Sequence, residues 1–396
     1  MRECPTCQRC LPDAAGVCPQ DGDLAKATIP GGIVVGDRYR LETRLGQGSV
    51  SIVYRAQDLV SSATMAVKVA LPQVVGSDRE LAQRMLAEIT AASKIKHPNV
   101  VGIIESGLIE QTVPFVVMEF VSGVTLHELL SDHRCLSPAE ALEYVSAIGA
   151  GLAAAHANKI IHGDLKPRNI LLEADRSLSE GVKILDFGMS AIKAGKLQRA
   201  VAGQSPKGLL RSALYLAPEE WSDEDEPDHR SDIYSLGVIL YEMLAGMAPF
   251  SGSTPAEIAE KHAHDPPHAP REIVAAIPEG VERVVLHALE KQPSDRPANA
   301  GEFRRELLET AERLGLEHNA VKSAPGIEEL RDAGVESPSG RLVVDISRLR
   351  EKRALSSGSN EIKVLGSKPA EKPAPDVEKP PQPSSFLDKV KRILGL

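Results

Sequence analysis

The sequence predicts an α+β protein in which most strands precede most helices. Between residues 37 and about 120, short runs rich in Val, Ile and Tyr have the alternation that is typical of strands. Residues 81–95 in this part have helical spacing instead. From about residue 138 to residue 315, apolar residues recur every three or four positions, as in helices. Because strands and helices are segregated along the chain, we expect a part that contains a sheet and a separate helical part.

Length and composition predict a soluble protein with at least one large core. The chain has 396 residues, of which 42% are hydrophobic and 26% are charged. Its net charge of -9 does not favour nucleic acid as a partner, because phosphate binding needs a concentrated basic surface. No run of 18 or more apolar residues occurs, and the first residues lack the apolar stretch of a secretory signal. We therefore expect a cytoplasmic protein.

Changes in composition divide the chain into four segments. A short cysteine-containing segment occupies residues 1–24, and the α+β region covers residues 37–315. Residues 319–384 are rich in Ser, Pro, Lys and Glu, which is the composition of a disordered linker. Residues 385–396 regain helical spacing, with apolar positions on one side and basic positions on the other. We expect this amphipathic helix to dock onto a partner or onto an anionic membrane, with a frayed end as the third alternative.

Polar residues interrupt the apolar pattern of the α+β region at several places. Residues 45–48, with the sequence LGQG, form a glycine loop between two strands, and such a backbone can approach phosphates closely. Lys68 lies in an otherwise apolar strand, where a buried ammonium needs an anionic partner, and Glu88 on the following helix is a candidate. Further along come HGDLKPRN at residues 162–169, ILDFGMS at residues 184–190 and APEEW at residues 217–221.

In this order, the motifs resemble those of eukaryotic-type (Hanks-type) serine/threonine protein kinases, and bacterial members most of all. The resemblance covers roughly 280 residues. It implies the two-lobed protein-kinase fold, with a small antiparallel sheet and one helix in the first lobe and a larger, mainly helical second lobe. It also implies transfer of the γ-phosphoryl group of ATP, with Mg²⁺, to serine or threonine hydroxyls of proteins in bacterial signalling, the kinase itself included.

The resemblance assigns catalytic roles to particular side chains. Asp164 would accept or orient the proton of the substrate hydroxyl, and Lys166 would neutralise the transferred phosphoryl group. Lys68, paired with Glu88, would hold the α and β phosphates of ATP. The Lys-Pro pair that follows Asp-Leu is the form found in serine/threonine kinases rather than in tyrosine kinases.

The resemblance also implies which residues bind the nucleotide and the metal. Asn169 and Asp186 would bind Mg²⁺, which prefers oxygen ligands. Two pairings are implied to be structural: Glu219 with Arg296, and Asp232 with the backbone of the catalytic loop. The residues implied to contact ATP are Leu45, Gly46, Gly48, Val53, Ala66, Lys68, Met118, Glu119, Val121 and Asp186.

Two alternative functions remain open. Ser51 stands where the family has the third glycine of its loop, and Gly163 stands where most members have arginine, so a pseudokinase that acts as a scaffold or sensor is one alternative. A small-molecule kinase is the other, because aminoglycoside and choline phosphotransferases use His-Gly-Asp. The Lys-Pro pair, the complete Asp-Phe-Gly and Ala-Pro-Glu motifs and the helix that begins near Asp232 favour a protein kinase.

Four of the five cysteines fall within the first 18 residues, which favours a metal site over disulfides in a cytoplasmic protein. Cys4 and Cys7 form a C-x-x-C pair, and Cys18 begins CPQD, which ends at Asp21. The segment resembles a truncated zinc ribbon of the kind found beside bacterial kinases. A closed zinc site needs four ligands, so we expect Cys4, Cys7 and Cys18 with either Asp21 or Cys10. The alternative is a disordered segment with reactive thiols.

Gly163 leads to one regulatory hypothesis. In most family members the arginine at this position pairs with a phosphate on the activation loop and orders that loop. Because this charge is absent here, we expect activity that does not need phosphorylation of the activation loop.

Treatment with a phosphatase tests this hypothesis. Protein from which mass spectrometry detects no remaining phosphate is expected to keep most of its activity, since no arginine at position 163 requires a phosphate partner. Loss of nearly all activity on dephosphorylation, with recovery after rephosphorylation, would contradict it.

Overall fold

The computed structural model describes residues 1–316, apart from residues 49, 77, 133–134, 175, 189–205 and 222–226. It also describes two short strands, β13 (Gly334–Glu336) and β14 (Leu342–Val344), which pair with each other in antiparallel register. Apart from these two strands, the linker predicted at residues 319–384 and the helix predicted at residues 385–396 lie outside the described residues.

The first lobe is built on a six-stranded antiparallel sheet with the order β4-β5-β6-β7-β9-β8. In β6 the side chains of Ile52, Tyr54 and Ala56 are buried and their neighbours are more exposed, which is the alternation of a strand with one face on a core. The strands are β4 (Val34–Val35), β5 (Tyr39–Gln47), β6 (Ser51–Asp58), β7 (Thr64–Ala70), β8 (Ile103–Ile109) and β9 (Val113–Glu119).

Helix α2 (Arg79–Ala92) packs against this sheet and follows the short helix α1 (Pro72–Val75). Asp78 caps α2, since its carboxylate accepts a hydrogen bond from Leu81 N at 2.9 Å. The buried side of α2 carries Met85 and Ile89, which belong to the same hydrophobic core as the strands. Ile89 lines a pocket together with Asp186 and Phe187, and the backbone of its neighbour Glu88 lies close to Gly188.

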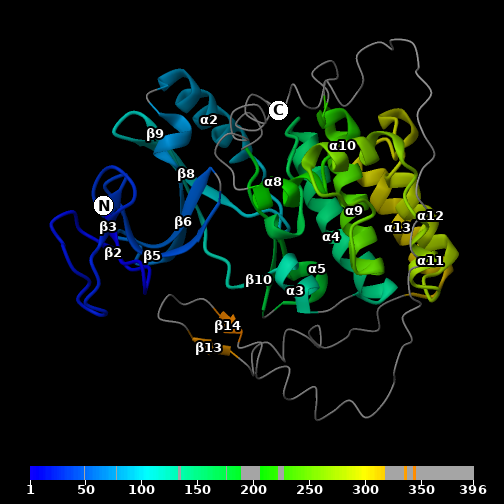
Figure 1. Ribbon diagram of the computed structural model, residues 1–396, viewed down its shortest axis with the longest axis horizontal. Helices are drawn as coiled ribbons and strands as arrows, with labels where there is room; N and C mark the ends of the chain where they lie inside the picture. Colours follow the sequence, from blue (N-terminus) through cyan, green and yellow to red (C-terminus); the bar gives the residue numbers. More distant parts are fainter. Residues whose placement is uncertain are drawn as a thin grey trace, which may run out of the picture.

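The second lobe is mainly helical, as the sequence predicted, and Figure 1 shows its helices beside the sheet of the first lobe. Helix α4 begins with a capping box formed by Ser137 and Glu140, and α9 ends at Gly246, which has the left-handed backbone common at helix ends. The helices are α3 (Leu126–Asp132), α4 (Pro138–Ala157), α5 (Leu178–Gly181), α8 (Pro206–Ala213), α9 (His229–Ala245), α10 (Pro255–His264), α11 (Pro270–Ile273), α12 (Glu279–Ala288) and α13 (Ala300–Arg313).

A small antiparallel sheet brings the polar motifs to the border between the lobes. Its strands, in the order β10-β11-β12, are β10 (Gly123–Thr125), β11 (Ile170–Glu173) and β12 (Val182–Ile184). The segment HGDLKPRN ends where β11 begins, and Asp186 follows two residues after β12. Because β11 and β12 pair side by side, the two segments are held next to each other.

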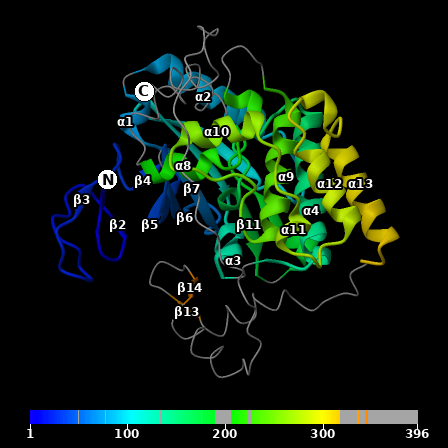
Figure 2. The same ribbon diagram turned by 45° about the vertical axis from the view of Figure 1, so that its right-hand side comes forward.

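The cysteine-containing segment forms a separate three-stranded sheet with the order β2-β1-β3. Its strands are β1 (Arg2–Glu3), β2 (Cys10–Leu11) and β3 (Lys26–Ala27), so the sheet extends past residue 24. Figures 1 and 2 both show it beside β5, at the outer side of the first lobe. Among the described residues, no helix has the length and apolar character needed to cross a membrane.

A buried ion pair ties the segment APEEW to the end of the helical lobe. Arg296 donates from Nη1 to Oε1 of Glu219 at 2.7 Å and from Nη2 to Oε2 at 2.8 Å, which confirms the predicted pair. Both side chains are buried, and Ser231 Oγ donates to the same carboxylate at 2.6 Å. Removal of one partner would leave an uncompensated charge in the core.

We therefore expect Arg296→Met to lower the free energy of unfolding by about 3–5 kcal/mol. Arg305→Met is the matched control, because Arg305 also pairs with a glutamate, Glu302, but is 65% exposed. The control should change stability by less than about 0.5 kcal/mol. Urea unfolding of the two variants measures the difference, and equal stabilities would contradict the importance of the buried pair.

Candidate active site

The sheet of the first lobe places several predicted ATP contacts on one face. In the strand register, Gly46 lies opposite Val53, and Val53 lies opposite Lys68. Ala66 lies opposite Met118 and is two residues from Lys68 in β7. Residues that are opposite each other, or two apart along a strand, point to the same side of a sheet. These five positions therefore form one continuous surface.

The glycine loop closes this surface at one end. Gly48 N donates to Ser51 O at 2.8 Å, which closes the turn between β5 and β6. Leu45 lies at a register shift between β5 and β6. Ser51 stands at the place of the family's third glycine and is only 4% exposed, paired with Ala70 in the sheet. A serine is therefore compatible with the strand at this position.

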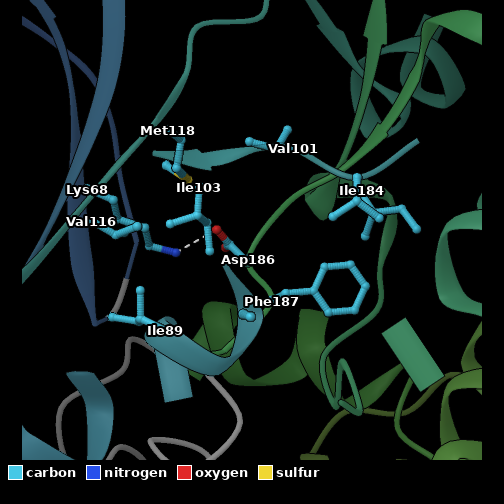
Figure 3. A pocket seen from close by; sticks show the side chains of 11 residues that line it. Lys68, Ile89, Val101, Ile103, Val116, Met118, Ile184, Asp186 and Phe187 are labelled. Atoms are coloured by element: carbon cyan, nitrogen blue, oxygen red, sulfur yellow. Dashed lines mark ion pairs between the residues drawn. The ribbon is translucent and has the colours of Figure 1, made fainter. Parts of the chain in front are cut away.

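An ion pair between Lys68 and Asp186 joins the two lobes. Lys68 Nζ lies 2.7 Å from Asp186 Oδ1, as Figure 3 shows. Asp186 has a left-handed backbone with a φ of 69°, a region that L-residues other than glycine rarely occupy. The sequence did not indicate this pairing. Glu88 lies nearby on α2, and its pairing with Lys68 stays a prediction.

The pair faces a pocket between the sheet, α2 and the Asp-Phe-Gly segment. Apart from these two residues, the lining is apolar, with side chains such as Ile103, Val116 and Met118 (Figure 3). Electrostatic attraction is stronger in such surroundings than in water, and an unpaired charge there would be costly. Lys68 and Asp186 therefore stabilise each other at the place where phosphates and a metal are predicted to bind.

The catalytic loop brings Asp164, Lys166 and Asn169 into one network. Lys166 Nζ donates to both carboxylate oxygens of Asp164, at 2.8 and 2.7 Å, and to Ser212 Oγ at 3.1 Å. Asn169 Nδ2 donates to the backbone oxygen of Asp164 at 2.8 Å and to its Oδ2 at 3.2 Å. Because the Nδ2 side of the amide faces Asp164, the amide oxygen points away from this carboxylate.

Asp232 anchors the backbone of the catalytic loop, residues 162–169, as predicted from the sequence. Its Oδ2 accepts from His162 N at 2.9 Å and lies 2.8 Å from His156 Nε2, and its Oδ1 accepts from Gly163 N at 2.9 Å. Burial alone would raise the pKa of the Asp232 carboxyl, but the hydrogen bond and charge of His156 outweigh burial and lower the pKa. The carboxyl is therefore ionised at neutral pH and accepts both backbone hydrogen bonds.

The backbone explains why glycine suits position 163. Gly163 has a φ of 67°, in the left-handed region where glycine has no steric penalty. His162, beside it, lies 2.8 Å through Nε2 from Leu185 O, and its ring makes an edge contact with Phe187 at 4.8 Å between centroids. Neither the left-handed backbone at Gly163 nor the contacts of His162 were predicted from the sequence, where Gly163 was interpreted only as a departure from the arginine of the family.

The segment after β9 is held by a glutamate side chain. Glu119 Oε1 accepts from Gly102 N at 2.9 Å and from Lys183 Nζ at 3.0 Å. This side chain thus connects the segment Met118 to Val121 with β12 of the other lobe. A nucleotide contact through the backbone of Glu119 is compatible with this use of its side chain. Lys183 was missed because a lysine in a short strand carries no signal of its own.

The predicted metal ligands near the N-terminus lie close together. The ligand atoms of Cys4, Cys7, Cys18 and Asp21 all lie within 4.8 Å of one another. Cys7 Sγ is 3.7 Å from Cys18 Sγ, and Asp21 Oδ2 is 3.1 Å from Cys4 Sγ and 3.5 Å from Cys18 Sγ. Two thiolates on a tetrahedral zinc are about 3.8 Å apart, given Zn–S bonds of about 2.3 Å. The Cys7–Cys18 distance therefore equals, to about 0.1 Å, the spacing of two cysteine ligands on one zinc ion.

Cys10, the other candidate for the fourth ligand, lies elsewhere. It is buried in the hydrophobic core of the first lobe with Met1 and Ile29, whereas its neighbour Leu11 packs with Cys4 and Cys18. Adjacent residues of a strand point to opposite faces. In β2, Cys10 therefore points to the core of the first lobe, and Leu11 points to the cluster of Cys4 and Cys18. The structure therefore favours Asp21 over Cys10 as the fourth member of the cluster.

Comparison with known proteins agrees with this geometry. The sequence model of the protein kinase domain matches residues 39–308. The chain belongs to the protein kinase family. The α+β, two-lobed kinase fold expected from the motifs is thereby confirmed. The matched residues leave the cysteine-containing segment outside the family match.

Several bacterial proteins are similar to this chain. The serine/threonine-protein kinase pkn3 of Myxococcus xanthus is 34% identical over 296 residues, which cover 74% of this chain and 53% of pkn3. The serine/threonine-protein kinase PknB of Mycobacterium tuberculosis is 35% identical over 280 residues, which cover 69% of this chain and 42% of PknB. The match therefore spans about half the length of these curated relatives.

The solved structures support the same fold. The crystal structure of the Mycobacterium tuberculosis PknI kinase domain superposes with a TM-score of 0.55 and a sequence identity of 23%. It covers 70% of this chain and 98% of the PknI domain. At this identity the likeness concerns the fold alone.

Asp232→Ala tests the anchoring of the catalytic loop. It leaves the buried N–H of His162 and the partly buried N–H of Gly163 without their acceptor, and loss of the partner of a buried donor costs about 1–3 kcal/mol. We expect amide hydrogen exchange at His162 and Gly163 to become at least about tenfold faster. Because folding lowers the pKa of Asp232, its contribution to stability is present above the ordinary pKa of about 4 and is lost as pH falls.

Asp228→Ala is the matched control for this experiment. Asp228 caps α9, the helix that contains Asp232, since its carboxylate accepts a hydrogen bond from Arg230 N at 2.7 Å. Loss of this cap should lower the free energy of unfolding by about 1 kcal/mol. Exchange at His162 and Gly163 should stay as in the unmodified protein. Equal exchange rates at these amides in both variants would contradict the anchoring role of Asp232.

Proposed function

We propose that the chain transfers the γ-phosphoryl group of ATP to serine or threonine hydroxyls of proteins. The observation that carries this proposal is the catalytic network, in which Lys166 and Asn169 both hold the carboxylate of Asp164. The relatives described above support it, because both are named serine/threonine-protein kinases. Since this chain spans only about half of those proteins, its own activity is a proposal.

The residues at the site fit ATP and Mg²⁺. Asp186 and Asn169 offer oxygen ligands, which Mg²⁺ prefers, and Lys68 offers a cation for phosphate oxygens. When bound, Mg²⁺ would neutralise charge on the phosphates. Glu88 is the proposed second partner of Lys68 when phosphates replace Asp186. The remaining predicted contacts with the nucleotide, at Leu45, Gly46, Gly48, Val53, Ala66, Met118, Glu119 and Val121, are part of this proposal.

The catalytic loop can orient a hydroxyl nucleophile. Lys166 holds both oxygens of Asp164, and its third contact, with Ser212 Oγ, connects the loop to the segment before APEEW. Asp164 would accept the proton of the substrate hydroxyl as the new bond forms, and Lys166 would stay close enough to balance charge on the transferred group. Ser212 marks where the hydroxyl-bearing segment of a protein substrate would dock.

The features that favoured a pseudokinase have structural explanations. Ser51 fits into β6 as a buried strand residue, and Gly163 matches a left-handed backbone position. For a small-molecule kinase, the Lys166 contact with Ser212 and the buried Glu219–Arg296 pair have no evident use, whereas both suit a peptide-docking segment. Docking of residues 385–396 to a partner or a membrane, and a cytoplasmic location, stay predictions.

We further propose that Cys4, Cys7, Cys18 and Asp21 hold a structural Zn²⁺. Burial raises the pKa of the Cys7 thiol to about 12, so without a metal this thiol stays protonated. A bound divalent metal displaces such protons, and a segment with strands of two residues has little other means of folding. The four ligands fill a closed site, which suits a structural rather than a catalytic role.

A phosphoryl-transfer assay tests the proposed activity. Wild type should transfer labelled γ-phosphate from ATP and Mg²⁺ to a generic protein substrate or to itself, and acid hydrolysis should release phosphoserine or phosphothreonine. Asp164→Asn should transfer at a rate lower by about 10²–10⁴-fold, because it removes the proton acceptor. Ser294→Ala, at an exposed position away from the site, is a control that should keep full activity. Absence of transfer by wild type that still binds ATP would contradict the proposal.

Metal content tests the zinc site and the choice of the fourth ligand. Protein purified without chelators should contain about one Zn²⁺ per chain by plasma mass spectrometry. Cys7→Ser and Asp21→Ala should lose most of this metal, whereas Cys10→Ala should keep it, since Cys10 lies in a separate core. Retention in Asp21→Ala combined with loss in Cys10→Ala would reverse the assignment.

A further inference from the structure

The metal cluster adjoins the strand that leads into the glycine loop. We call residues 4–9 the cysteine knuckle. Arg44 N, in β5, donates to Gln8 O of the knuckle at 3.0 Å, and Arg9 forms an antiparallel bridge with Thr43. Thr43 and Arg44 directly precede residues 45–48, the glycine loop. The knuckle therefore contacts β5 immediately before the segment that would cover the phosphates.

An ion pair strengthens this junction. Arg44 Nη1 lies 3.1 Å from Oε1 of Glu3, which directly precedes Cys4 and is only 3% exposed. Arg44 Nη1 also donates to the side chain of Gln47 within the glycine loop at 3.1 Å. One arginine thus contacts both the residue beside a metal ligand and the loop itself.

The pairing of β5 with its neighbours in the six-stranded sheet is irregular around Thr43 and Arg44. The pairing of β5 with β6 shifts register between Leu41 and Thr43 and again between Arg44 and Gly46. On the other side, β4 pairs only with Tyr39 and Arg40. Irregular pairing of this kind bends a strand and disrupts its ladder. The knuckle therefore supplies the outer hydrogen bonds of β5 where the sheet itself supplies few.

The knuckle in turn depends on its ligands for order. Within it, Cys4 N donates to Arg9 O and Gln8 N donates to Cys4 O, both at 3.0 Å. Gln8 has a left-handed backbone with a φ of 61°, which costs energy for a residue other than glycine. A tight turn with this geometry needs a constraint, and a metal bound by Cys4 and Cys7 is such a constraint.

We propose that metal binding at the cysteine knuckle positions the glycine loop and thereby raises the affinity of the kinase for ATP. This inference rests on the proposed zinc site and on the proposed binding of ATP. It adds that the two sites, one outside and one inside the kinase domain, are coupled through Thr43 and Arg44. Such coupling is reciprocal, so ATP raises the affinity for the metal by the same factor.

The test compares the dissociation constant of a fluorescent ATP analogue, with Mg²⁺, for zinc-loaded and zinc-free full-length protein. We expect the dissociation constant of the zinc-free protein to be about five- to tenfold higher, at the low end of usual coupling between sites. The chain has one tryptophan, Trp221, which is 1% exposed in the helical lobe. Unchanged fluorescence of Trp221 shows that this lobe stays folded without zinc.

Two variants separate coupling from general damage. Arg44→Ala removes the ion pair to Glu3 but no metal ligand, so it should bind zinc and show a smaller difference between loaded and zinc-free protein. Arg40→Ala is the matched control, because Arg40 is an exposed arginine of the same strand that contacts Gln57 instead of the knuckle. For this variant, the ratio of the ATP-analogue dissociation constants of zinc-free and zinc-loaded protein should equal the ratio for wild type.

If the zinc-free protein unfolds, its affinity for the ATP analogue cannot be measured, and a second measurement tests the coupling instead. Competition for zinc with a chromogenic chelator at equilibrium should give a zinc dissociation constant at least about fivefold lower with saturating ATP analogue than without it. Equal zinc dissociation constants with and without the analogue, or equal ATP dissociation constants in folded loaded and zinc-free protein, would overturn the coupling while both sites stand. Protein that holds no zinc would overturn the zinc site, and loaded protein that binds no ATP analogue would overturn the proposed kinase activity.

Discussion

The ion pair between Lys68 and Asp186 is the interaction on which the active site depends. Lys68 is fixed in the middle of a sheet, and Asp186 follows a strand of the other lobe, so the 2.7 Å contact joins the two halves of the site. Both charges face an apolar pocket, and the Lys68 side chain, only 7% exposed, needs an anionic partner there. Each charge partly neutralises the other, and in the proposed function phosphates would become the partner of Lys68 and a metal the partner of Asp186. The site is in this way kept assembled before its ligands bind.

A second constraint, the hydrogen bonds of Asp232, holds the catalytic loop in place. Asp232 uses both carboxylate oxygens on the backbone of the loop, and the ring of His162 reaches from the loop to Leu185 and Phe187. The loop and the Asp-Phe-Gly segment are thus fixed to each other and to a buried helix. The proposed role of Asp164 needs this support, because a proton acceptor works only when it is held within hydrogen-bond distance of its donor.

The sequence predicted some of the residue contacts of the site, and others became evident only from the fold. The motif order indicated the kinase fold, the Glu219–Arg296 pair and the Asp232 anchor, because these depend on residue type at known positions. The left-handed backbone at Gly163 and the contact of Lys166 with Ser212 arise from tertiary structure, which spacing does not encode. Likewise, spacing left Cys10 and Asp21 equally suitable, and only the alternation of faces in a two-residue strand separates them. The Lys68–Asp186 contact was not expected either.

The dependence of ATP binding on Mg²⁺ tests the central claim about this pair most directly. Titration calorimetry would compare wild type with Asp186→Asn, with and without Mg²⁺. Mg²⁺ is expected to strengthen ATP binding to wild type and to have little effect on Asp186→Asn, which lacks the charge proposed to bind the metal. Without Mg²⁺, the variant is expected to bind ATP at least as tightly as wild type, because Lys68 no longer has to leave Asp186. An equal gain in affinity from Mg²⁺ in both proteins would contradict the proposed role of this ion pair.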